Sequence, residues 1–151
     1  PRVVLSWAPH TRALPQSVPN SFAQWMTGWG GADFVIAQPE GYELSGEFTR
    51  GATILHDQDQ ALKDADFVYV KNWSSYSEYG QILGSHPDWM ITADKLKATR
   101  EARVMHCLPV RRNLVIADEV LDSASSVVTM EAGNRVWAAQ AVLSEILKEG
   151  K

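Results

Sequence analysis

Six short apolar runs, spaced along the chain, constrain the fold of this sequence most. The runs occupy residues 2–7 (RVVLSW), 33–38 (DFVIAQ), 52–56 (ATILH), 66–71 (DFVYVK), 103–108 (RVMHCL) and 126–130 (SVVTM). Each is rich in Val, Ile or Phe, and several lack polar alternation, which is typical of strands that are covered on both faces. We therefore expect these runs to be the strands of a mostly parallel, buried sheet.

Helical patterns separate the predicted strands. The expected helices cover residues 17–26, 57–65, 92–99 and 134–150. The last one has the strongest amphipathic pattern, carried by Val136, Trp137, Gln140, Val142, Leu143, Ile146 and Leu147, and Gly150 can end it. Strands that alternate with helices predict an α/β fold, in which a three-layer, doubly wound, mostly parallel sheet has helices on both faces, as in Rossmann-like proteins.

The length and the amino terminus indicate one domain of a larger protein. A chain of 151 residues suits a single domain. Pro1 stands almost directly before the first apolar run, so we expect residues 1–151 to be part of a longer polypeptide.

Composition excludes several classes of function. The net charge of -4 and the absence of any Lys/Arg cluster longer than a pair argue against nucleic-acid binding. No apolar run approaches the roughly 18 residues that cross a bilayer, and no signal-peptide pattern opens the chain. A single cysteine rules out an internal disulfide and favours the cytoplasm. One Cys and four scattered His do not suggest a metal site, and we expect no cofactor.

Parallel sheets bind ligands outside the carboxyl ends of their strands. The segments after the predicted strands read SWAPH (6–10), AQPEGYEL (37–44), VKNW (70–73), HCLP (106–109) and TMEAGNR (129–135). They and the residues just beyond them supply His10, Lys71, His106, Cys107, Arg111, Arg112 and Arg135. Because arginine and lysine suit carboxylates and phosphates, the pattern predicts a site for a small polyanion or dicarboxylate.

Each of these residues also has a purely structural reading. A cysteine at a strand end can be a small buried hydrophobe, a histidine beside it a core residue, and arginines after a turn are usually solvated. The long irregular segment 73–89 is typical of a binding loop or lid.

Two ordered motifs resemble a known family. HCLP (106–109), followed by EAGNR (131–135), resembles the carboxy-terminal half of the aspartate/ornithine carbamoyltransferases. The match continues through WAPH (7–10), PEGYEL (39–44) and ADFVYVKNW (65–73), so it covers nearly the whole chain. The resemblance implies that residues 1–151 are the acylornithine-binding domain. It also implies that the amino-terminal carbamoyl-phosphate domain, which carries the Ser-x-Arg-Thr and His-Pro-x-Gln motifs, is absent from this chain.

Lys71 distinguishes branches within that family. The ornithine enzymes carry an aspartate at the matching position, facing the cationic α-amino group of ornithine. Acylation removes that charge, and a carboxylate on the acyl group would suit a lysine, although Lys71 could also be a solvated lysine at a strand end. The N-acetylornithine enzymes carry a lysine where this chain has Val115. Residues 7–26 are instead similar to the N-succinylornithine branch.

We therefore expect carbamoyl transfer from carbamoyl phosphate to the δ-amine of N2-succinyl-L-ornithine, giving N-succinylcitrulline and phosphate in arginine biosynthesis. N-acetylornithine as substrate, or a non-catalytic acylornithine-binding fragment, are the alternatives. The resemblance also implies a homotrimer.

The resemblance implies roles by position. His10, Lys71 and Arg111 are expected to bind the acylated ornithine. Cys107 and Leu108 are expected to contact the carbamoyl group, largely through main-chain carbonyls, and Arg135 to bind carbamoyl phosphate. Cys107 is the expected catalytic residue, without forming a covalent bond. His106, expected within the strand, and Arg112, on the outer face of the turn, are expected to be structural.

Overall fold

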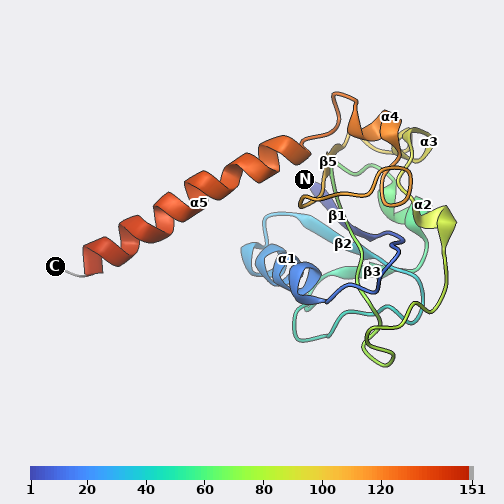
Figure 1. The fold of residues 1–151 in the computed structure, drawn as a ribbon, viewed down its shortest axis with the longest axis horizontal. Coiled ribbons are helices and arrows are strands. Elements are labelled where there is room, and N and C mark those ends of the chain that lie inside the picture. Colours follow the sequence, from blue (N-terminus) through green and yellow to red (C-terminus); the bar gives the residue numbers. More distant parts are fainter. Residues whose placement is uncertain (150–151) are drawn as a thin grey trace.

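The computed structural model describes residues 1–149 and contains one sheet of five parallel strands. The strands are β1 (Arg2–Trp7), β2 (Asp33–Ala37), β3 (Thr53–Leu55), β4 (Phe67–Lys71) and β5 (Arg103–Met105). Their order across the sheet is β3-β2-β1-β4-β5 (Figure 1). Each lies within a run that was predicted to be a strand.

Helices cover both faces of this sheet. They are α1 (Ser17–Trp29), α2 (Gln58–Leu62), α3 (Ala93–Leu96), α4 (Asp118–Leu121) and α5 (Val128–Glu149), with a 3-10 turn, η1, at Pro87–Trp89. The chain crosses from β1 to β2 in one direction and from β3 to β4 in the other. Since such crossovers are right-handed, α1 lies on the opposite face from α2 and α3 (Figure 1). The predicted doubly wound α/β fold is confirmed, and α4 is an additional helix that we did not predict.

The core lies around the central strand β1. Val4, Leu5, Val35, Ile36 and Val68 are fully buried. Each apolar side chain of this kind contributes about 1.5–3 kcal/mol when buried. Because β1 pairs with a strand on each side and helices cover both faces, its residues need no polar alternation.

The predicted strand at residues 126–130 is wrong. Only a single bridge forms, between Ser126 and Val104, and α5 begins at Val128 instead of residue 134. The run is β-branched, but the hydrogen bond from Glu131 N–H to Val127 O, 2.9 Å long, already belongs to a helix. Met130, Glu131 and Ala132 are good helix formers, and the helix continues through Gly133 to Glu149, so the helical ladder extends backward over the β-branched residues. The predicted helix end at Gly150 lies outside the described residues.

Helix α5 projects away from the sheet (Figure 1). Its apolar residues Val136, Trp137, Leu143 and Leu147 are exposed, Trp137 to 71%. An amphipathic helix normally buries its apolar face against another element. The face predicted for this helix therefore exists, but it covers nothing among the described residues.

Candidate active site

The strand order places a binding site between β1 and β4. From β1 the chain moves to β2 on one side, and β4 later pairs with β1 on the other side. The carboxyl ends of two such strands diverge into a crevice, where doubly wound proteins bind ligands. His10 lies three residues beyond the end of β1, and Lys71 is the last residue of β4. The topology thus brings together two residues that are far apart in the sequence.

Hydrogen bonds connect the two loops that form this crevice. The buried Asn72 donates its side-chain Nδ2–H to Ala8 O at 2.8 Å, and Trp7 donates its indole N–H to Trp73 O at 2.8 Å. Ala8 N–H donates to Lys71 O at 3.1 Å. The loop after β1 is therefore held against the loop after β4. A narrow pocket between them is lined by residues that include His10, Asn72 and Trp73.

His10 and Arg111 meet although 101 positions separate them. Arg111 Nε–H donates to His10 Nε2 at 3.2 Å. That bond requires an unprotonated Nε2. At the other ring nitrogen, Nδ1, the Arg12 backbone N–H lies at 3.0 Å and Arg12 O lies at 3.1 Å. Burial lowers the pKa of His10, and the charges of Arg111 and Lys71 lower it further. A neutral imidazole thus orients the Arg111 guanidinium, and Lys71 and Arg111 supply positive charge.

The HCLP turn (106–109) follows β5 at the carboxyl end of the strands, the same end as the crevice. His106 lies one residue beyond the strand, not in it as predicted, and is buried with its Nδ1 against Cys107 O. Cys107 is a half-buried free thiol, and Leu108 is exposed. Arg112 pairs with Asp118 at 2.8 Å and Asp122 at 2.6 Å, which agrees with its predicted structural role.

His106 makes stability depend on pH. Burial and the nearby positive charge of Lys71 lower its pKa from 6.5 to about 4. The unfolded chain therefore binds more protons than the folded chain between these two values, and stability falls as the pH falls through that window. We expect this residue to cost about 2 kcal/mol of unfolding free energy between pH 7 and pH 5. Urea unfolding of the wild type and His106→Gln at both pH values measures it. An equal loss in both proteins contradicts the assignment.

Two further residues contact the HCLP turn and were not predicted as site residues. Tyr69 is buried beside Cys107, and burial, Cys107 and Glu131 together raise the pKa of its hydroxyl. Burial raises the pKa of Glu131, and the nearby backbone of His106 opposes this shift. Two features of the sequence could have indicated that these residues belong to the site. Tyr69 precedes Lys71 by two positions on one strand, and Glu131 opens the EAGNR motif.

Arg135 lies elsewhere than predicted. It is an exposed residue of α5, not a residue at a strand end. In the described part of the chain, no hydrogen bond or ion pair joins it to His10, Lys71 or Arg111.

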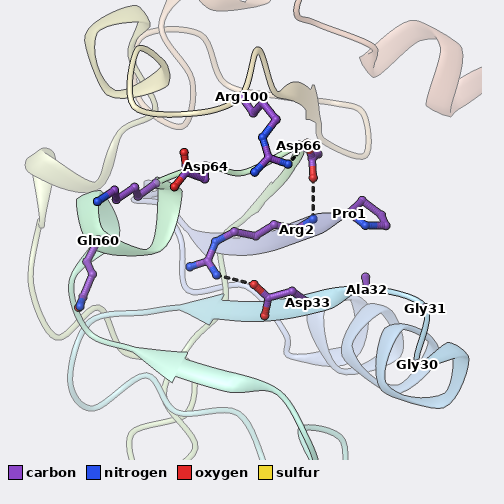
Figure 2. A pocket seen from close by; sticks show the side chains of 11 residues that line it. Pro1, Arg2, Gly30, Gly31, Ala32, Asp33, Gln60, Asp64, Asp66 and Arg100 are labelled. Atoms are coloured by element: carbon purple, nitrogen blue, oxygen red, sulfur yellow. Dashed lines mark hydrogen bonds and ion pairs between the residues drawn. The ribbon is translucent and has the colours of Figure 1, made fainter.

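A cavity of about 840 Å³ lies at the opposite end of the strands from the crevice, near the amino ends of β1 and β2 (Figure 2). Arg2 pairs with Asp33 at 2.5 Å, and Arg100 pairs with Asp66 at 3.2 Å. These charges compensate one another, and the cavity lies at the amino ends of the strands, whereas doubly wound sheets bind ligands at the carboxyl ends. This cavity is therefore not the candidate site.

Residues 1–149 contain no metal-binding cluster and no membrane-spanning helix. No three His, Cys, Asp or Glu side chains gather closely enough to hold a metal ion. No helix in this range is long and apolar enough to cross a membrane.

The fold and the site together define a doubly wound α/β domain whose crevice carries positive charge for an anionic ligand. The chain belongs to the aspartate/ornithine carbamoyltransferase family, because the family described as "Aspartate/ornithine carbamoyltransferase, Asp/Orn binding domain" matches residues 16–146. The resemblance seen in HCLP and EAGNR is thereby confirmed.

Within this family, the chain is similar to enzymes that are named for acylated ornithines. The chain is 47% identical over 150 residues to N-succinylornithine carbamoyltransferase of Bacteroides thetaiotaomicron, covering 98% of this chain and 47% of that protein. A crystal structure of N-acetyl-L-ornithine transcarbamylase matches with a TM-score of 0.88 and 28% identity, over 95% of this chain and 49% of the other. A single-residue variant of that enzyme, complexed with carbamyl phosphate and N-succinyl-L-norvaline, also matches with a TM-score of 0.88, at 27% identity over 95% of this chain and 48% of that one. This chain thus spans about half the length of the relatives it matches.

Proposed function

We propose that the protein to which this domain belongs transfers the carbamoyl group of carbamoyl phosphate to the δ-amine of N2-succinyl-L-ornithine. The products are N-succinylcitrulline and phosphate. The observation that carries this proposal is the position of Lys71, at the end of β4 in the crevice between β1 and β4. The identity of 47% to an N-succinylornithine carbamoyltransferase supports it.

The charges in the crevice suit an acylated substrate. N2-succinylornithine has no α-ammonium group and carries two carboxylates. Lys71 and Arg111 can each take one carboxylate through a charge-assisted hydrogen bond. A free α-ammonium group beside Lys71 would be repelled, because like charges in a partly desolvated site disfavour binding. The neutral His10 adds no further charge and holds Arg111 in place.

The reaction needs positioning more than chemical participation by the protein. The neutral δ-amine attacks the carbonyl carbon of carbamoyl phosphate, the C–O bond to phosphate breaks, and the proton lost by the amine leaves with the phosphate. In our proposal Cys107 and Leu108 contact the carbamoyl group, the thiol of Cys107 packing beside the amine without bonding to it. Arg135 contributes positive charge toward carbamoyl phosphate. Aligning two bound reactants in this way accounts for much of the rate acceleration in such transfers.

The proposal includes a second domain and an assembly. We infer that an amino-terminal carbamoyl-phosphate domain completes the site, since this chain spans about half of its relatives. The exposed apolar face of α5 supports this, because it needs a partner. A homotrimer in the cytoplasm, acting in arginine biosynthesis, is the setting that the family resemblance implies.

An assay of the full-length enzyme tests the proposed function. We expect carbamoyl transfer with succinylornithine, at a kcat/KM at least about tenfold above that with acetylornithine, which corresponds to about 1.4 kcal/mol of discrimination. Ornithine itself should be a poor substrate because its α-ammonium group faces Lys71. Citrulline formation measured with all three amines gives the ranking. A preference for acetylornithine overturns the succinyl assignment, and no transfer to any of them leaves a binding domain.

A further inference from the structure

We propose that the hydroxyl of Tyr42 positions residues 81–84 as a wall of the acylornithine crevice beside His10, which makes Tyr42 a positioning residue for the acylated substrate. The proposal rests on the function proposed above, because it names a further residue on which binding of the acylornithine depends. Tyr42 belongs to the PEGYEL segment (39–44), and residues 81–84 belong to the long irregular segment 73–89.

Tyr42 is a fixed point beside the crevice. Its side chain is buried, and its ring packs against Trp7 with 4.8 Å between the ring centroids. The ring of His86 meets it edge to face, with 5.8 Å between the centroids. The indole N–H of Trp73 donates to the main-chain oxygen of Tyr42 at 2.7 Å. Because Trp7 ends β1 and Trp73 follows β4, Tyr42 is fixed against the two strands that form the crevice.

The hydroxyl of Tyr42 holds the irregular segment by its backbone. Leu83 N–H donates to the Tyr42 hydroxyl oxygen at 3.1 Å. The Leu83 side chain also lies over Gly41, because a Cβ added to that glycine would be 3.6 Å from Leu83 Cδ1. The Leu83 side chain is itself exposed, so burial contributes little to holding this residue in place. The hydrogen bond to a buried, fixed hydroxyl therefore has a large share in positioning it.

The two neighbours of Leu83 form part of the crevice. Ile82 and Gly84 line the narrow pocket that His10 also lines. Ile82 is an exposed apolar side chain, and it lies in a pocket beside a site of positive charge. N2-succinylornithine carries methylene groups between its charged groups, so it suits a crevice that combines cationic side chains with an apolar wall. A displacement of the Leu83 amide moves both neighbours and therefore changes the shape of this wall.

Tyr42→Phe in the full-length enzyme tests the hydroxyl alone, because the buried ring stays. We expect KM for the acylornithine to rise about 5- to 10-fold, since one hydrogen bond that shapes its binding site is lost. Both kcat and KM for carbamoyl phosphate should change less than about twofold, because the wall contacts the substrate alike before and during the reaction. Tyr79→Phe removes an exposed hydroxyl from the same irregular segment and should match the wild type.

A second variant removes the other partner of the same hydrogen bond. Leu83→Pro has no backbone N–H to donate, and it should raise KM for the acylornithine at least as much as Tyr42→Phe, which covers the case that Tyr42→Phe does not fold. Combining both substitutions should raise KM less than about twofold beyond Leu83→Pro alone, since the bond is already absent. Fully multiplied effects in the double variant, or an unchanged KM for the acylornithine in folded Tyr42→Phe, would falsify the proposal.

Two readouts without turnover separate this proposal from the proposed function. The Leu83 amide should exchange hydrogen at least about tenfold faster in Tyr42→Phe than in Tyr79→Phe. Calorimetry in the presence of carbamoyl phosphate should give a Kd for N-succinyl-L-norvaline, which has no δ-amine, about 5- to 10-fold higher in Tyr42→Phe than in Tyr79→Phe. Both differences in an enzyme that transfers no carbamoyl group refute the function and leave the role of Tyr42 intact. Equal exchange or equal affinity in the two variants refutes the role of Tyr42, whatever the reaction proves to be.

Discussion

Lys71→Ala should lower kcat/KM for succinylornithine by about thirty- to a thousandfold in the full-length enzyme, which is roughly 2–4 kcal/mol. The reason is that a substrate carboxylate would lose its charge-assisted partner inside a crevice that other elements partly desolvate. Lys71 is half-buried at the end of β4, and its positive charge lowers the pKa of both His10 and His106. Steady-state kinetics of the purified variant, with circular dichroism to check folding, measures this effect.

A second lysine provides the control for that measurement. Lys97 is exposed and pairs with Asp94 three residues away, so Lys97→Ala should change kcat/KM by less than about twofold. If Lys71→Ala is folded and behaves like Lys97→Ala, then Lys71 is a solvated strand-end lysine. The succinyl assignment would then lose its main physical argument.

Leu143→Asp should destabilise the full-length enzyme by roughly 3–5 kcal/mol and abolish most of its turnover. Leu143 lies on the exposed apolar face of α5, which we propose packs against the amino-terminal domain. A carboxylate buried there would be unpaired, and the contact of the leucine side chain would be lost as well. Thermal or urea unfolding of the full-length variant measures the change.

The same helix offers two controls. Glu145 lies about 160° around α5 from Leu143 and is exposed, so Glu145→Ala changes the charge on the opposite face and should be close to neutral. In the isolated 151-residue chain, Leu143→Asp should change the unfolding free energy by less than about 0.5 kcal/mol, because the side chain is already exposed. Equal destabilisation by both substitutions in the full-length enzyme speaks against a docked apolar face.

Local pattern predicted the central part of the fold. The runs around Val4, Val35 and Val68 are continuous and apolar because both sheet faces are covered, and that property can be read without knowing the neighbours. The same reasoning failed at residues 126–130. That run has strand-forming residues, but it lies beside a three-residue edge strand that offers it one bridge, whereas a long helix follows directly. Propensity alone cannot weigh these two alternatives.

Part of the candidate site could also be predicted from the sequence. The rule that ligands bind at strand ends selected His10, Lys71 and Cys107, and the topology places the first two in the crevice between β1 and β4. Glu131 and Tyr69 were missed because their surroundings depend on the tertiary structure. Both lie near the HCLP turn, although they belong to α5 and β4, which are distant in the sequence.

The sequence by itself determined the α/β class, the positions of the central strands and the family, since apolar periodicity and the HCLP and EAGNR motifs are local properties of the chain. Only the tertiary structure decided that burial, with the charges of Arg111 and Lys71, lowers the pKa of His10, because Arg111 meets His10 from 101 positions away. It also decided that Arg135 belongs to a helix that leaves the sheet, with an apolar face that no described residue covers. Protonation and burial depend on which groups surround a side chain in space, and a single sequence does not state those neighbours.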